Sequence, residues 1–195
     1  MSAAAIVAGE TEVDPAPVVI VMGVSGSGKT TLGEALAARH GFRFLDADDF
    51  HPAENVAKMR SGVPLDDADR APWLEHLSER LAGATEPTVL ACSALKARYR
   101  TRLAAGCDRA LFVHLAGSRD TIGARLSARA DHYMPPSLLQ SQLDALEAPG
   151  EGEGALALDC DQPVDALCAA VMAALDARRE GSGAIDTLSP AGIRP

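Results

Sequence analysis

Short apolar runs alternate with longer stretches of helical periodicity along most of the chain. The apolar runs predict strands at 17–22, 42–45, 88–92, 110–115 and 155–159. The stretches between and after them predict helices at 29–40, 53–60, 70–83, 96–105, 119–128, 136–147 and 163–178. Short apolar strands that alternate with helices indicate a parallel sheet covered on both faces. The pattern therefore predicts an α/β fold of three layers, with a five-stranded parallel sheet between two layers of helices.

The two ends of the chain depart from this alternation. Residues 1–16 are rich in alanine and acidic, and residues 180–195 are rich in Gly, Ser and Pro. We expect both to be disordered tails around one folded domain at 17–179. The acidic start has no basic region of the kind that opens a signal peptide, and no apolar run is long enough to cross a bilayer. We therefore expect no contact with a membrane.

Charge and cysteine content narrow the function further. The 195 residues carry a formal net charge of −9, which argues against a nucleic-acid surface because phosphate backbones require basic patches. An anionic substrate must then be bound by a local group of Lys and Arg. The four cysteines form no C-x-x-C pair and no zinc-ligand spacing. Free thiols are expected, in a reducing compartment, which predicts a cytoplasmic protein.

The most specific local pattern is Gly23-Val24-Ser25-Gly26-Ser27-Gly28-Lys29-Thr30, a complete Gly-x-x-x-x-Gly-Lys-Thr sequence. It follows an apolar strand and opens a helix, which is the context that a phosphate-binding loop requires. The loop amides and the helix N-terminus would surround the phosphates of ATP. Lys29 would span the β- and γ-phosphates, and the Thr30 hydroxyl would bind Mg²⁺. The alternative, an ordinary Gly/Ser-rich turn, leaves the Lys-Thr pair without explanation.

Acidic residues follow the second predicted strand, in Leu45-Asp46-Ala47-Asp48-Asp49-Phe50-His51-Pro52. On an extended segment Asp46 and Asp48 point the same way. We expect Asp48 to orient and deprotonate an attacking hydroxyl, with Asp46 nearer the metal. A solvated acidic turn before the next helix is the alternative on spacing alone. Farther along, Asp69 is a candidate N-cap, and Arg70 could clamp a carboxylate or simply form a surface ion pair.

The third predicted strand ends in Cys92-Ser93-Ala94-Leu95-Lys96 and carries no acidic residue. Many phosphate-loop motors and switches hold their magnesium aspartate at this place, so its absence favours a small-molecule or nucleoside monophosphate kinase. Arg125 and Arg129 lie four residues apart on one helix, ahead of a loop with two prolines. This pattern is typical of a mobile lid at about 125–138 that brings cations to the phosphates. Pairing with surface acids is the alternative for both arginines.

Several motifs in this order resemble gluconate kinase (gluconokinase) of the phosphate-loop type, over about residues 17–178. The residues that carry the resemblance are Leu45–Pro52, Lys58–Leu65, Asp67–Leu74, Cys92–Lys96, and Gln142 with Leu146–Pro149. The resemblance implies the P-loop kinase fold of shikimate and nucleoside monophosphate kinases. It also implies ATP- and Mg²⁺-dependent phosphorylation of the terminal hydroxyl of D-gluconate, giving 6-phosphogluconate, and a homodimer.

The motifs and the resemblance together assign roles to individual positions. The expected catalytic residues are Lys29, Asp48 and Arg129, and the expected metal ligands are Thr30 and Asp46. The nucleotide would be bound by Gly23, Ser25, Gly26, Ser27, Gly28, Lys29, Thr30, Thr31, Arg125, Arg129, Gln162 and Pro163. The substrate would be met by Asp48, His51, Lys58, Arg70, Ser93, Lys96, Arg100 and His132. Two other functions remain open: a kinase for another small acid such as shikimate, and an ATP-binding switch that has no acceptor.

Overall fold

The computed structural model describes residues 16–107, 109–128 and 136–180, with side chains omitted at 136–138. The sheet in this part of the chain has five parallel strands in the order β2-β3-β1-β4-β5. These strands are β1 (Val18–Met22), β2 (Arg43–Asp46), β3 (Thr88–Ala91), β4 (Leu111–Ala116) and β5 (Leu156–Asp159). The predicted parallel α/β sheet is confirmed, with strand ends shifted by one residue.

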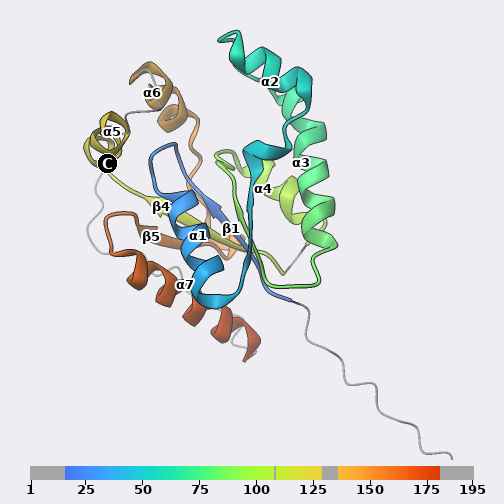
Figure 1. Cartoon of the computed structure of the whole chain (residues 1–195), viewed down its shortest axis with the longest axis vertical. Coiled ribbons are helices and arrows are strands. Elements are labelled where there is room, and N and C mark those ends of the chain that lie inside the picture. The colour runs from blue at the N-terminus through green and yellow to red at the C-terminus, as the bar shows by residue number, and fades with distance from the viewer. Residues whose placement is uncertain (1–15, 108, 129–135, 181–195) are drawn as a thin grey trace, which may run out of the picture.

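Helices cover both faces of the sheet, as the apolar strands predict (Figure 1). Their bounds are α1 (Lys29–His40), α2 (Ala53–Arg60), α3 (Asp67–Ala82), α4 (Ala97–Ala104), α5 (Arg119–Ser127), α6 (Pro136–Ala145) and α7 (Val164–Arg179), with short 3₁₀ helices η1 (Ala47–Phe50) and η2 (Glu151–Glu153). α1 and α7 pack in one apolar cluster, and α3 and α4 pack in the other. Alternate residues of β1 serve the two clusters, so the whole strand is buried.

The start of α3 differs from its sequence prediction. The helix begins at Asp67 rather than at 70, and its N-cap is Asp66 rather than Asp69. The Asp66 carboxylate accepts a hydrogen bond from the Asp69 N–H, and the Asp69 carboxylate accepts one from the Asp66 N–H. This reciprocal capping box satisfies two amides at once, which one aspartate at the cap would not. The prediction of Asp69 as the N-cap is therefore wrong by one turn.

The predicted state of the cysteines is confirmed. All four are buried and none forms a disulfide bond: Cys92, Cys107, Cys160 and Cys168. None of the helices in the described part of the chain has the length and apolar character needed to cross a membrane. In Figure 1 the loop after β1 rises between α5 and α6 on one side and α2 and α3 on the other. The carboxyl ends of the strands, where open α/β sheets bind ligands, therefore lie between these two groups of helices.

Candidate active site

The loop between β1 and α1 has the backbone of a phosphate cradle. Gly23, Gly26 and Gly28 have φ angles of +141°, +85° and +98°, a region that residues with side chains rarely adopt. A Cβ on Gly23 would come within 2.9 Å of the Leu115 carbonyl oxygen and of the Ser27 hydroxyl. Gly28 is the N-cap of α1, whose first turn contains no acidic residue. The positive end of that helix therefore faces the loop without a carboxylate to offset it.

The side chains of the loop suit a nucleotide with a divalent cation. The Lys29 ammonium donates to the Val24 carbonyl oxygen at 3.1 Å, so it folds back over the loop. The Ser27 hydroxyl is buried and has no hydrogen-bond partner in the structure. Thr30 and Thr31 are exposed in the first turn of α1. These donors and hydroxyl oxygens are of the types that hold the phosphates and Mg²⁺ of ATP in phosphate-loop proteins, so the residues present fit both.

The sequence interpretation assumed that the acidic segment after β2 is extended, but the structure shows a helical turn there. Residues Ala47–Phe50 form the 3₁₀ helix η1, and the Asp46 carboxylate caps it by accepting from the Asp48 N–H at 3.1 Å. Asp46 therefore has a structural role besides any metal contact. Partial burial, with the neighbouring Asp48 and Asp49, raises its pKa, although the capping bond and Lys29 oppose this. The Asp48 side chain is 88% exposed and faces solvent above the sheet edge.

The Cys92 thiol shows that these groups share one edge. Complete burial raises its pKa to about 12, and the nearby charges of Asp48, Lys29 and Asp46 make smaller contributions to that pKa. Cys92 directly follows β3, the strand between β1 and β2, and its N–H donates to the Val21 carbonyl. The next residue, Ser93, accepts a hydrogen bond from the Gly23 N–H at 3.2 Å. The phosphate loop, the acidic turn and the segment after β3 are therefore adjacent.

The His51 ring is held by an aromatic contact with helix α3. Its ring stacks on Trp73 of α3, with centroids 4.1 Å apart and planes inclined by 16°. Its Nε2 lies 3.8 Å from the Asp48 carboxylate, and its Nδ1 is buried without a partner. Burial lowers the pKa of His51, with a smaller contribution from Arg70, while Asp48 acts in the opposite sense. The Trp73 indole N–H donates to the Ala47 carbonyl oxygen, so one side chain supports both η1 and His51.

A cationic cluster surrounds Tyr99 at the start of α4. The Tyr99 ring lies 5.5 Å from the Lys96 ammonium, 5.6 Å from the Arg98 guanidinium and 5.8 Å from that of Arg70. The carboxylate of Asp67 pairs with Lys96 at 3.5 Å and with Arg98 at 2.5 Å, and it accepts from the Tyr99 hydroxyl. Lys96 and Arg70 were predicted to meet the substrate, and they do lie together. Tyr99, Arg98 and Asp67 were not among the predicted site residues.

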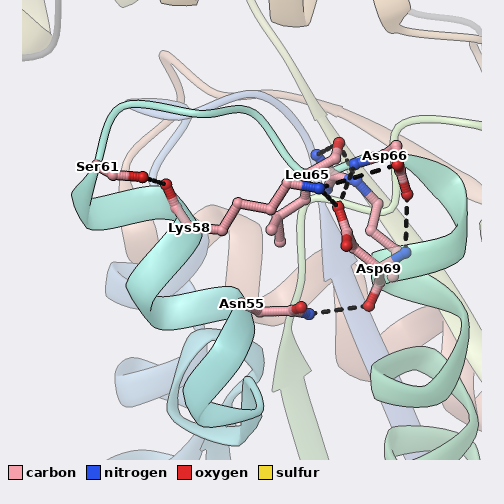
Figure 2. A network of polar contacts seen from close by, with 7 residues as sticks. Asn55, Lys58, Ser61, Leu65, Asp66 and Asp69 are labelled. Atoms are coloured by element: carbon pink, nitrogen blue, oxygen red, sulfur yellow. Dashed lines mark hydrogen bonds and ion pairs between the residues drawn. The ribbon is translucent and has the colours of Figure 1, made fainter.

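Lys58 lies in a polar network between α2 and α3, seen in Figure 2. Its ammonium pairs closely with Asp69 and lies 3.9 Å from Asp66, the two residues of the capping box. The Asn55 amide donates to the Asp69 carbonyl in the same network. The hydrogen bond from Lys58 is the main cause of the lowered pKa of Asp69. Lys58 therefore ties the protruding helix α2 to the start of α3, in addition to the substrate contact predicted for it.

Arg100 differs more from its predicted role than the other predicted substrate residues do. Its side chain is 1% exposed and forms a two-point ion pair with Glu153, at 2.5 and 2.8 Å. Its Nη1 donates to the carbonyl oxygens of Ala94, Leu95 and Glu147. Ala94 has a φ of +42°, which is unusual for a residue with a side chain. Since its guanidinium is enclosed and bonded, we assign Arg100 to positioning the segment 93–96 rather than to contact with the substrate.

Arg125 of α5 reaches the loop after β5. It donates to the Cys160 carbonyl oxygen at 2.9 Å and to the Asp161 carboxylate at 3.0 Å. Gln162 and Pro163 follow in the same exposed loop, so these three residues expected to bind the nucleotide lie near one another. The pairing with Asp161 is the alternative that the sequence left open for this arginine. Arg129 and His132, in the predicted lid, lie outside the described residues.

A hollow of about 260 Å³ lies away from these groups. It is lined by Arg43, Leu45, Arg80, Gly83, Ala84, Thr85, Glu86 and Thr88. Arg43 and Thr88 begin β2 and β3, so the hollow is at the amino-terminal edge of the sheet. Because ligands of open α/β sheets bind at the opposite edge, we place the candidate site at the phosphate loop and not in this hollow.

Known proteins are similar to this chain in both sequence and fold. A family model described as an AAA domain matches residues 18–149. A probable gluconokinase of Mus musculus is 46% identical, over 81% of this chain and 97% of the relative. The crystal structure of a gluconokinase from Sinorhizobium meliloti 1021 is 44% identical, with a TM-score of 0.77 over 86% of this chain and 95% of that one. A shikimate kinase from Acinetobacter baumannii shares the fold at 16% identity and a TM-score of 0.54, over 84% and 95% of the two chains.

The parallel sheet, the glycine-rich loop after β1 and the charged groups beside it define a phosphate-loop kinase. Such a fold alone is shared by kinases with different acceptors. The sequence identity to gluconokinases and the nearly complete coverage of those relatives identify the family within this class. The chain belongs to the gluconokinase family.

Proposed function

We propose that the protein transfers the γ-phosphoryl group of ATP to the terminal hydroxyl of D-gluconate, giving 6-phosphogluconate and ADP. The observation that carries this proposal is the placement of a phosphate loop and a cationic cluster after neighbouring strands β1 and β3. Membership in the gluconokinase family supports gluconate as the acid. A phosphate donor and an anionic sugar acid would then meet at one edge of the sheet.

The nucleotide side of the site consists of the loop and the first turn of α1. The amides of Ser25 to Thr30 and the Lys29 ammonium would hold the β- and γ-phosphates. Thr30 and Asp46 would hold Mg²⁺, which when bound neutralises charge on the phosphates. Arg125, Gln162 and Pro163 would border the base, with Arg129 beside the phosphates. Most of the rate gain would come from positioning and charge stabilisation, because phosphoryl transfer requires little covalent chemistry from the protein.

The acceptor side consists of the acidic turn and the cationic cluster. Asp48 would orient the attacking hydroxyl and accept its proton, since its carboxylate is exposed and lies in η1 directly after β2. Lys96 and Arg70 would meet the gluconate carboxylate beside Tyr99, where Arg98 adds a third cation. His51, whose Nε2 lies 3.8 Å from the Asp48 carboxylate, would border the same hydroxyl. Ser93, Lys58 and His132 complete the proposed acceptor set.

The domain limits, the oligomeric state, the cellular location and the lid are also part of this proposal. We infer one catalytic domain at 17–179 between two tails, acting as a homodimer in the cytoplasm, with a lid at about 125–138. Size-exclusion chromatography with light scattering would test the dimer, and limited proteolysis would test the domain limits.

A coupled assay for ADP release tests the proposed reaction. The purified protein is given ATP and Mg²⁺ with D-gluconate, with shikimate, or with no acceptor. Rapid ADP release only with gluconate, together with 6-phosphogluconate detected by mass spectrometry, is the expected result. A higher rate with shikimate would favour the other small-acid kinase. Slow release that no acceptor changes would favour the nucleotide switch.

A further inference from the structure

Glu147 binds the two peptide groups that flank Lys96. Its N–H donates to the Leu95 carbonyl oxygen at 2.8 Å, and its carboxylate accepts from the Ala97 N–H at 2.6 Å. Its own carbonyl oxygen accepts from the buried Arg100 guanidinium at 2.9 Å. One residue, about fifty positions later in the chain, therefore holds the backbone immediately before and immediately after Lys96.

The start of α4 depends on this contact because the helix has no cap of its own. Lys96 is the N-cap residue, but its side chain makes no capping hydrogen bond, and the first turn contains no acidic residue. A lysine ammonium has donors only, so it cannot accept from the free N–H groups of a helix start. The Glu147 carboxylate takes this role at Ala97. A cation at a helix N-terminus is also unfavourable, and a local rule broken in this way is typical of a functional position.

The segment that carries Glu147 is fixed at its other end as well. The Gln142 side chain accepts from the Ser25 N–H at 2.7 Å and donates to the Ser25 hydroxyl at 3.2 Å. Leu146 packs against both apolar clusters. The Glu147 residue is exposed, yet its backbone is tied to Leu95 and Arg100. Its carboxylate is therefore presented to α4 from a fixed place rather than from a freely moving surface chain.

Lys96 needs such support to meet a ligand in one place. Its side chain is long and flexible, so the reach of its ammonium depends on where the backbone is held. Two residues earlier, Ala94 has a φ of +42°, a conformation that persists only when the surroundings impose it. If a tie is removed, the segment can relax, and the ammonium then leaves its position 3.5 Å from Asp67 and 5.5 Å from the Tyr99 ring.

We propose that Glu147 is a positioning residue for acceptor binding, which holds Lys96 where its ammonium meets the acceptor carboxylate. This role rests on the proposed function, in which Lys96 binds the acid end of gluconate. Without the Glu147 carboxylate, only a fraction of the molecules would hold Lys96 correctly, and the affinity for the acceptor falls in proportion to that fraction. Loss of a helix cap shifts such a balance about fivefold.

Steady-state kinetics of three variants test this role. Glu147→Met removes the oxygens that cap Ala97, so KM for gluconate should rise about fivefold while kcat and KM for ATP stay within about twofold of the wild type. Glu147→Gln retains a side-chain carbonyl oxygen and should keep KM for gluconate within about twofold. Glu151→Met is the matched control and should equal the wild type, since Glu151 is exposed and its side chain makes no hydrogen bond or ion pair among the described residues.

A merely structural role predicts a different pattern. If Glu147 only stabilised the fold, kcat and KM for ATP would change together with KM for gluconate, or Glu147→Met would lose stability with normal kinetics. Either result would overturn the proposal. Equal effects of the Met and Gln variants would overturn it too, because a cap requires an oxygen and not a charge.

Amide hydrogen exchange at Ala97, followed by nuclear magnetic resonance, tests the contact without an acceptor. The Ala97 N–H should be protected in the wild type and in Glu147→Gln, and it should exchange at least about fivefold faster in Glu147→Met. An unchanged rate in Glu147→Met would contradict the proposed cap. A failure of the proposed function is distinguishable from this, since it appears as a wild type that does not phosphorylate gluconate.

A double variant shows whether Glu147 acts through Lys96. The ratio kcat/KM for gluconate, taken from initial rates at low gluconate, should fall more in Lys96→Met than in Glu147→Met, because the cation itself is lost. Adding Glu147→Met to Lys96→Met should lower the ratio by less than about a further twofold, since no ammonium remains to be positioned. A further fall of about fivefold would show that Glu147 acts elsewhere and would overturn the proposal.

Discussion

Arg100 and Glu153 form a two-point ion pair directly behind the segment that carries Ser93 and Lys96. Nε and Nη2 of the arginine lie 2.5 and 2.8 Å from the two carboxylate oxygens, and the bond from Arg100 is the main cause of the lowered pKa of Glu153. The remaining nitrogen, Nη1, donates to three carbonyl oxygens, one of them from Ala94. Because Ala94 sits at an unfavourable φ of +42°, the ion pair holds a backbone bend that would not persist without support.

Arg100→Met should therefore destabilise the fold strongly. The substitution leaves the carbonyl oxygens of Ala94, Leu95 and Glu147 without their donor and the partly exposed Glu153 carboxylate without its partner, which costs about 2–4 kcal/mol in all. Unfolding in urea, followed by circular dichroism, measures this loss. Arg102→Met, exposed two residues later on α4, is the matched control and should stay within about 0.5 kcal/mol of the wild type. A folded Arg100→Met protein with normal stability and a raised KM for gluconate would instead return Arg100 to the substrate contacts.

The sequence predicted the three layers, the alternation of strands and helices and the phosphate loop, because these depend on local patterns. A buried strand is apolar throughout, and the loop is a continuous motif of eight residues. The roles of the cations on α4 depend instead on which face of the helix is enclosed. Arg100 shares its face with Leu103, three residues on, whereas Arg98 and Arg102 lie on the exposed face. This spacing was available in the sequence and would have set Arg100 apart from the surface cations.

Contacts between distant segments could not be predicted in this way. No local signal links Gln142 to Ser25, or Trp73 to Ala47, because each pair forms only when separate helices pack against the same sheet edge. The N-cap of α3 was misplaced for a different reason. Asp66, Asp67 and Asp69 are all suitable caps, and the choice depends on which pair can form the reciprocal box.

The His114 side chain should make the stability fall in mild acid. His114 lies on β4 and is 7% exposed, and burial together with nearby Arg100 lowers its pKa from the ordinary value of 6.5. The unfolded chain therefore takes up a proton first as the pH falls below about 6.5, so the free energy of unfolding decreases until the folded protein is protonated too. His51, with its own lowered pKa, adds to this slope.

Urea unfolding at a series of pH values between 7.5 and about 5 measures this effect. His114→Gln should give a shallower decrease than the wild type, whatever its stability at neutral pH. His40→Gln, at the exposed end of α1, serves as the control and should keep the slope of the wild type. An identical slope in the His114 variant would show that the buried imidazole is not the group responsible.

Trp73→Phe should separate the two contacts that this residue makes. The phenyl ring can still stack on His51, but the hydrogen bond to the Ala47 carbonyl oxygen is lost. A buried carbonyl without its donor costs about 1–2 kcal/mol. Because Ala47 begins η1, which carries Asp48, kcat should fall several-fold while the nucleotide affinity stays constant. Stability and steady-state kinetics on the same preparation test this. A stability loss with unchanged kcat would show that the position of η1 does not affect the catalytic step.

Asp48→Asn should lower kcat by about a hundredfold or more while KM for gluconate changes little. The carboxylate is exposed at the start of the acceptor side and lies 3.8 Å from the His51 ring, so the amide can still orient a hydroxyl but cannot accept its proton. The adjacent Asp49→Asn removes the same charge from the same exposed turn and should retain kcat within about threefold, which excludes a general electrostatic effect. Steady-state kinetics with saturating ATP separate the two parameters. A rise in KM with kcat preserved would make Asp48 a binding residue, and equal losses in both variants would assign the effect to the charge of the turn.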